Sequence, residues 1–205
     1  MNGNIQRLRC LACGELIHPD TAAKNDGLCA PCKGGYREQI EEGRRQRRHE
    51  RALERSPERI YWRILVQRVH ASREAFARLP QAERTYYALR MLMGEVCNGG
   101  FHALFANNSG ALYALMLDGL LELEADETLG LLAEAKELLL GRGAVPLDEG
   151  ERNELLPDPE VLAKLMPWRD ARLREIEEAF WAGADALDEQ CTRYAVAQGL
   201  YPAGC

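Results

Sequence analysis

Four cysteines near the N-terminus have a spacing that suits metal coordination. Cys10 and Cys13 form one C-x2-C pair, and Cys29 and Cys32 form a second pair after fifteen intervening residues. Two residues between cysteines let a tight turn aim both sulfur atoms at one ion, and two such turns complete a tetrahedral site. Because four thiolates leave no open coordination position, the spacing predicts one structural Zn2+ and no catalytic metal.

An iron centre or a redox-active dithiol is the alternative for these cysteines. The surrounding residues 1–35 hold few apolar side chains, so the metal must supply most of their folding free energy, on the order of 10 kcal/mol or more. The arrangement resembles a zinc ribbon or treble-clef finger, in which the second pair leads into a helix, here expected near Tyr36. The odd total of seven cysteines and the lack of a signal-peptide core argue against a secreted disulfide framework.

A second group of chemically reactive residue types lies in "CNGGFHALFANNSG", residues 97–110. Cys97, His102 and Asn107 are the types that serve as nucleophile, base and orienting residue in thiol hydrolases. In such enzymes the three partners usually come from distant segments, whereas here they lie within eleven residues. We therefore expect a structural role for this stretch and no enzymatic activity. Cys97 and His102 are then left without an assigned role, as is Cys205 elsewhere in the chain.

The structural interpretation explains most of the stretch. Gly99 and Gly100 allow a positive φ or close helix approach where a helix ends, with Asn98 as its cap. Glu95, one turn earlier, is expected to accept hydrogen bonds from backbone N–H groups freed by this break. A second break is predicted at 107–110, with a side chain there capping the next helix. The residues assigned to this structural motif are Glu95, Asn98, Gly99, Gly100, Phe101, Phe105, Asn107 and Gly110.

Helical periodicity covers most of the remaining chain. One helix is expected from Ser56, a second from about Gln81 to the glycine pair, and a long last helix over about 168–198. Residues 144–157 have the composition of a loop, and no alternating strand pattern appears after residue 36. The fold class predicted is all-α with a small zinc-ribbon or treble-clef-like module. The predicted parts are a metal module over 1–35, an arginine-rich connecting helix over 36–56 and an all-α domain over 57–205.

Charge is unevenly distributed along the chain, whose net charge is −6. Residues 1–99 contain 18 Lys and Arg against 12 Asp and Glu, whereas residues 100–205 contain 8 against 20. Two halves of opposite charge indicate that each half binds a different partner, or that the two halves bind each other. No apolar run approaches the roughly 18 residues that span a bilayer, so we expect a cytoplasmic protein without a membrane partner.

The connecting helix concentrates five arginines within eight residues. Next to a metal module, such a segment could grip the phosphates of a nucleic acid. Alternatively, neighbouring glutamates pair with the arginines at i,i+3 and i,i+4, which is the commoner role of a charge run on an exposed helix. The arginines concerned are Arg44, Arg45, Arg47, Arg48 and Arg51.

A family resemblance is carried by "EVCNGGFHALFANNSG", the Leu- and Ala-rich pair of helices after it and the distal "LREIEEAFWAGADALDEQCTRY". These segments resemble the bacterial DNA-mimic-protein domain, a family most of whose members have no assigned function. The resemblance covers about residues 58–198 and excludes the metal module. It implies an all-α fold, no enzymatic activity, frequent homodimerisation and an acidic surface that occupies the DNA-binding face of a regulator. The partner expected is therefore a protein, such as a DNA-binding regulator.

The acidic half offers carboxylates for such a surface. On neighbouring helical turns they lie about 5–6 Å apart, so a helix can hold a row of negative charge where a DNA-binding protein expects phosphates. An acidic face that serves only solubility is the alternative. The candidate row comprises Glu122, Glu124, Asp126, Glu127, Glu134 and Glu137, joined by Asp148, Glu149, Glu151 and Glu154.

Overall fold

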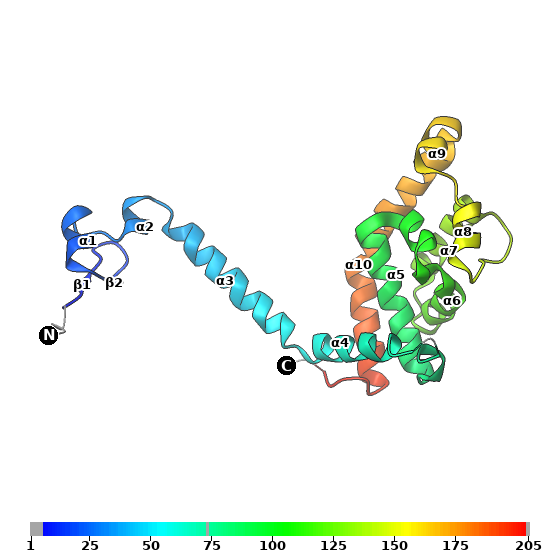
Figure 1. Ribbon diagram of the computed structural model, residues 1–205, viewed down its shortest axis with the longest axis horizontal. Helices are drawn as coiled ribbons and strands as arrows, with labels where there is room; N and C mark the ends of the chain where they lie inside the picture. The colour runs from blue at the N-terminus through cyan, green and yellow to red at the C-terminus, as the bar shows by residue number, and fades with distance from the viewer. Residues whose placement is uncertain (1–5, 73, 204–205) are drawn as a thin grey trace. The chain divides into compact units, whose positions relative to one another are not determined.

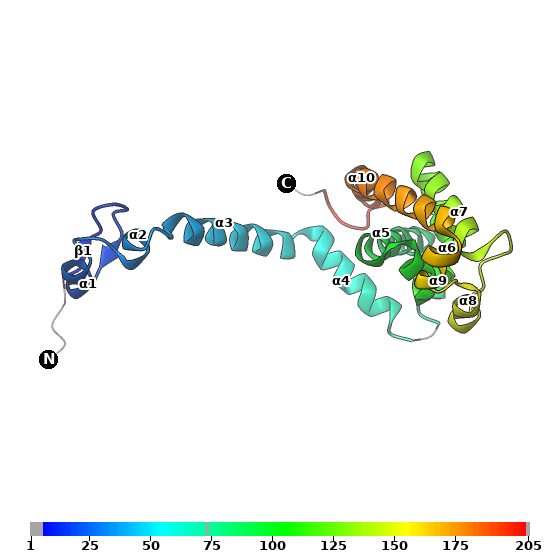
Figure 2. The ribbon, with the colours of Figure 1, turned by 90° about the horizontal axis from the view of Figure 1, so that it is seen from above.

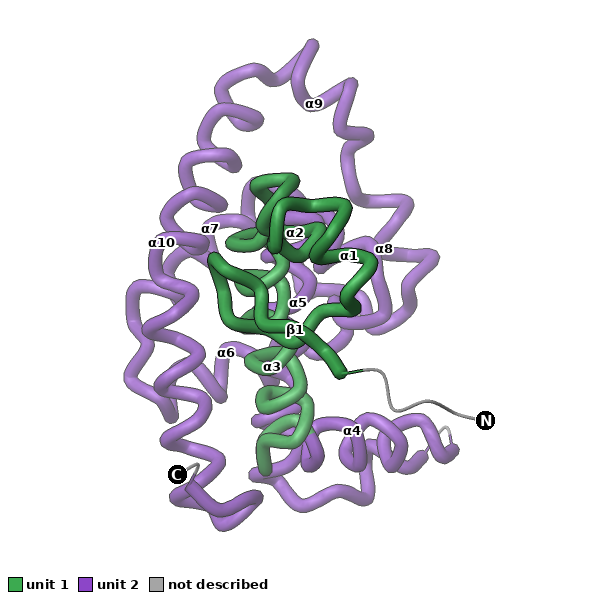
Figure 3. Tube along the Cα trace, turned by 90° about the vertical axis from the view of Figure 1, so that its left-hand side faces the viewer, with its two compact units in different colours: residues 1–59 green, residues 60–205 purple. Residues whose placement is uncertain are grey.

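The computed structural model describes residues 6–72 and 74–203, so Cys205 lies outside the described residues. The chain divides into two compact units, residues 1–59 and residues 60–205, which are coloured separately in Figure 3. The four cysteines belong to the first unit together with the arginine-rich helix. The second unit contains the stretch 97–110 and the acidic residues of the candidate row.

The first unit consists of a short hairpin and two short helices around the four cysteines, followed by one solvated helix. Leu8 pairs with Ile17 in a short antiparallel hairpin, and the buried side chains of this unit are only Cys10, Ile17, Ala22 and Cys29 among the residues described. The following helix buries no residue, because almost all of its side chains are polar. The elements are β1 (Leu8–Arg9), β2 (Leu16–Ile17), α1 (Pro19–Lys24), α2 (Ala30–Lys33) and α3 (Arg37–Glu54).

The second unit consists of helices, which confirms the all-α prediction. Its first helix begins as expected, since Ser56 Oγ accepts a hydrogen bond from Arg59 N at 3.2 Å. The α-helices are α4 (Pro57–Val69), α5 (Gln81–Ala106), α6 (Tyr113–Glu122), α7 (Asp126–Leu140), α8 (Glu149–Leu155), α9 (Pro159–Leu165) and α10 (Pro167–Ala197). Two 3-10 turns, η1 (Phe76–Arg78) and η2 (Asn108–Leu112), flank α5.

The core of the second unit lies between α5 and α10, which run side by side in Figures 1 and 2. Phe101 of α5 meets Phe180 of α10 edge to face, with ring centroids 5.5 Å apart. α6 packs closely on α5 because Gly119 leaves room for Leu89 and Thr85, whose side-chain atoms would lie only 3.0–3.2 Å from a Cβ at Gly119. Cys191 of α10 is fully buried in this core.

One detail of the second unit agrees with the sequence prediction and another differs from it. The helix expected to break at Gly99 and Gly100 does so at Gly100, where φ is 72° and ψ is −177°, and a second helical segment continues within α5 to Ala106. The loop expected over 144–157 contains α8, whose N-terminus is capped by Asp148. Across the residues described, no helix combines the length and apolar character needed to cross a lipid bilayer.

Candidate functional site

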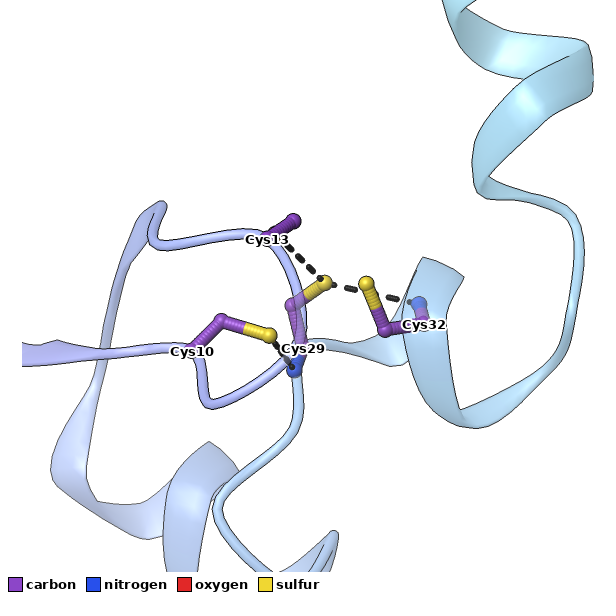
Figure 4. Close-up of side chains that lie close together, drawn as sticks. All are labelled: Cys10, Cys13, Cys29 and Cys32. Carbon is purple, nitrogen blue, oxygen red and sulfur yellow. Dashed lines mark hydrogen bonds between the residues drawn. The ribbon is translucent and has the colours of Figure 1, made fainter.

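The four predicted metal-ligand cysteines come together in the first unit. Their sulfur atoms all lie within 4.8 Å of one another, and Cys13 Sγ is 3.8 Å from Cys29 Sγ (Figure 4). Sulfur atoms that are each about 2.3 Å from one tetrahedral zinc are about 3.8 Å apart, so the spacing fits such an ion. The cluster is thus compatible with a metal site built from four thiolates.

The turns around the cysteines orient their sulfur atoms by backbone hydrogen bonds. Cys29 N donates to Cys10 Sγ at 3.2 Å, and this bond, followed by one from Cys13, lowers the pKa of Cys10 to about 6. The hydrogen bond with the Cys29 thiol and burial raise the pKa of Cys32 to about 12. Neighbouring thiols cannot all ionise without a compensating charge, so a divalent cation is the natural partner for the complete set.

One carboxylate links the metal module to α3. Glu15, two residues after Cys13, accepts hydrogen bonds from Arg37 at 2.7 Å and from Arg44 at 3.5 Å. The bond from Arg37 and then its charge hold the pKa of Glu15 at about 2, against the opposing effect of burial. Arg44 is therefore engaged within the first unit and is less available to an external phosphate.

The other candidate arginines of α3 fall into two groups. Arg45 donates to Glu42 one turn earlier, as expected for a charge run on a solvated helix. Arg47, Arg48 and Arg51 are exposed, and none of the three has an ion-pair partner among the residues that the structure describes. Among the described residues, the arginines of this helix that lack an ion-pair partner thus lie in its C-terminal half.

The kink at Gly100 exposes a backbone N–H that a distant carboxylate satisfies. Glu177 of α10 accepts a hydrogen bond from Phe101 N at 2.9 Å. The positive φ favours glycine at this position, and a Cβ on Gly100 would lie 2.2 Å from Glu177 Oε1, so the carboxylate would have to shift. The sequence prediction assigned this acceptor role to Glu95 and was wrong, because nothing in the local pattern marks a partner 76 residues away.

Glu95 instead organises the second break of the stretch. Its carboxylate accepts hydrogen bonds from Asn107 Nδ2 at 2.8 Å and from Ser109 Oγ at 2.5 Å. The segment after Asn107 forms η2, and no side chain caps the N-terminus of η2 or of α6, contrary to the predicted cap. Asn98 is exposed and lies two residues before the break in helical geometry at Gly100.

A buried arginine completes the packing around this break. Arg152 of α8 has no exposed surface, and its guanidinium donates to the carbonyl oxygens of Phe105, Asn107, Pro146 and Leu147 at 2.7–2.9 Å. Gly110 lies against it, since a Cβ there would be 2.7 Å from Arg152 Nε. Phe101 and Phe105 are fully buried. No sequence pattern marked Arg152, which lies in a polar segment expected to be a loop.

The residues of the hypothetical thiol hydrolase have separate partners. His102 Nε2 donates to the carbonyl oxygen of Pro157 at 3.0 Å, and the Asn107 amide is bound to Glu95. Partial burial raises the pKa of the Cys97 thiol, which disfavours the thiolate that a nucleophile requires. His102 and Asn107 therefore bind different partners at different places in the fold.

The acidic candidates cluster mainly at α7. Asp126, Glu127, Glu134 and Glu137 have spacings that place them on one side of this helix, and all but the half-buried Glu134 are exposed. Arg172 of α10 donates to both carboxylate oxygens of Glu134, at 2.7 and 2.9 Å, so that charge is partly neutralised. We call Asp126, Glu127, Glu134 and Glu137 the α7 acidic side.

The remaining acidic candidates lie outside the α7 acidic side. Glu122 is exposed at the end of α6, and Glu124 is exposed in the turn before α7 with a φ of 56°. Asp148 caps α8 by accepting from Glu151 N at 3.0 Å, so its role is local. Glu149, Glu151 and Glu154 are exposed on α8.

The helical unit matches a known protein family. A family model described as DMP19-like protein matches residues 77–198, which is more than half of the chain and includes the whole stretch from Glu95 to Gly110. The metal module lies outside the matched residues. Neither the curated proteins nor the solved structures contain a match to this chain.

Proposed function

Because the chain belongs to the family of DMP19-like proteins, we propose that it is a non-enzymatic interaction protein whose helical unit mimics DNA. The partner proposed is a basic protein, such as a DNA-binding regulator, that meets the α7 acidic side. The four cysteines hold one structural Zn2+ in this proposal. Bound there, the ion would cross-link the two cysteine turns and stabilise the fold of the metal module.

The observation that carries the proposal is the position of the charge on α7. Asp126 and Glu137 lie eleven residues apart, about 16 Å along the helix axis. One DNA strand presents about five phosphates over that length. The whole helical unit, residues 60–205, has 14 Lys and Arg against 23 Asp and Glu, a net charge of −9 that would steer a basic partner toward it.

Neutralising this side without changing its shape tests the proposal. A full-length chain with Asp126→Asn, Glu127→Gln and Glu137→Gln should lose the proteins that the wild type captures from a native lysate. Captured regulators should also be released by added duplex DNA, because DNA and the mimic compete for one surface. The matched control is Glu178→Gln with Asp185→Asn, two exposed acidic residues of α10. Capture that survives the α7 substitutions but not the α10 substitutions contradicts the proposal.

A second candidate function is nucleic-acid binding by the first unit, and it is favoured by the exposure of Arg47, Arg48 and Arg51 without ion-pair partners among the described residues. Triple substitution of these arginines by alanine should weaken binding of labelled duplex DNA. It should also flatten the plot of the logarithm of the binding constant against the logarithm of salt concentration, by an amount equivalent to about three phosphate contacts. Arg44→Ala with Arg45→Ala is the matched control, since both side chains already pair with glutamates. Equal losses in the two variants would count against a specific role for the exposed arginines.

A further inference from the structure

A groove of about 650 Å³ lies within the helical unit and shares no residue with the α7 acidic side. Its lining residues come from α4, η1, α5, η2 and the start of α8, together with His70 and Asn107. Ligand sites typically enclose about 300–1,000 Å³ and combine an apolar lining with a few polar groups. This groove has both properties, and neither the metal module nor the mimicry of DNA makes use of it.

The apolar part of the groove is formed by one face of α4 opposite one face of α5. Trp62, Val66 and Val69 recur at i, i+4 and i+7, so they share a side of α4. Trp62 stacks on Tyr87 of α5, with ring centroids 5.5 Å apart and an interplanar angle of 22°. Val66, Val69 and Met91 are only partly buried. These side chains leave apolar surface that another apolar side chain can cover.

The other part of the groove is acidic. Glu95 continues the row of Tyr87 and Met91 by a further step of four residues, and it lies about 12 Å along α5 from Tyr87. Burial and then the negative charge of Glu95 raise the pKa of Tyr87, consistent with both groups facing the same space. Glu149 supplies a second, exposed carboxylate, and His70 is the one imidazole among the lining residues. The groove therefore changes from apolar to negative along its length.

We propose that this groove binds a segment of a partner protein that presents a long aliphatic side chain and, one helical turn away, an arginine or lysine. The aliphatic group covers Val66, Val69 and Met91, and the cation meets Glu95 and Glu149. Asn107 and Ser109 keep the Glu95 carboxylate in place through the bonds described above. The inference rests on the proposed function only in that the ligand is a protein, since it uses a different surface.

Three fluorescein-labelled helical peptides and the full-length chain test the proposal by fluorescence anisotropy. The first is a capped alanine- and glutamine-based peptide with Leu and Arg four residues apart; the second has Ala for Leu, and the third has Glu for Arg. Saturable binding of the first peptide is expected. Affinity should fall about tenfold when Leu is replaced, because its burial is lost, and at least as much when Arg becomes Glu.

Variants of the protein locate the binding. Glu149→Gln, at an exposed position, should weaken the Leu–Arg peptide about two- to fivefold, and Val66→Lys should abolish binding by placing a cation in the apolar part. If Val66→Lys does not fold, Glu149→Gln and the peptide series still decide. Asp126→Asn with Glu137→Gln is the control that tests the α7 acidic side and should leave peptide binding unchanged. The inference would be overturned if the Leu–Arg peptide did not bind saturably or if the three peptides bound with equal affinity. It would also be overturned if the α7 control weakened peptide binding as much as the groove variants do.

Discussion

Replacing Gly100 by alanine perturbs the kink of α5 in two ways. At φ 72° and ψ −177°, a residue with a Cβ is strained by about 1–3 kcal/mol. The new Cβ would also lie 2.2 Å from Glu177 Oε1, so Glu177 must withdraw from Phe101 N. Loss of that hydrogen bond to a charged acceptor adds about 1.5–3 kcal/mol. Gly100→Ala should therefore destabilise the helical unit by about 2.5–6 kcal/mol.

Urea denaturation followed by tryptophan fluorescence measures this change in the full-length chain. All three tryptophans, Trp62, Trp168 and Trp181, belong to residues 60–205, so the signal reports the helical unit. Gly94→Ala is the matched control, because Gly94 lies in the same helix, is exposed and has open space around it. It should stabilise the unit by about 0.5–1 kcal/mol. If Gly100→Ala lowers the free energy of unfolding no more than Gly94→Ala does, the account of the kink is refuted.

Three further predictions concern other parts of the chain. Arg152→Met should cost about 3–5 kcal/mol in the same urea assay, because four carbonyl oxygens, one buried and three in part-buried bonds, lose their donor; an unchanged midpoint would show that water replaces it. Burial raises the pKa of Glu177, so its contribution to the free energy of unfolding is most favourable below the unfolded pKa of about 4.3 and declines as pH rises through the folded pKa. Glu177→Gln should therefore lose less stability than the wild type as pH rises through this range. Parallel curves of stability against pH for the two proteins would contradict this. Chelation of the proposed Zn2+ should collapse the dispersed amide NMR signals of residues 6–35 and leave the tryptophan-detected midpoint unchanged.

Features set by neighbours in sequence were predictable. The C-x2-C pairs place their sulfur atoms close together because each turn is local, and the cysteines are indeed clustered. The cap formed by Ser56 and the long helix α10 follow from side-chain type and periodicity over a few turns. The glycine pair also marked the right place in the chain, although only Gly100 departs from helical geometry.

Features set by distant contacts were not predictable. Glu177 is one of many acidic residues in a helix with an acidic surface, and only the packing of α10 on α5 brings it to Phe101 N. Arg152 lies among polar residues that resemble a loop, and its burial depends on carbonyl groups from two other segments. Glu95 was correctly marked as an acceptor, but its donors are the side chains of Asn107 and Ser109. A single sequence carries no measure of such pairings.

The irregular segment between α7 and α8 is tied to both helices by side-chain hydrogen bonds. Lys136 of α7 donates to the carbonyl oxygen of Gly143, and Arg152 of α8 donates to those of Pro146 and Leu147. A protease must draw about ten residues of chain into an extended form, which requires that these bonds break together. Trypsin should therefore cut after the exposed Arg142 slowly, at a rate governed by opening of the surrounding helices.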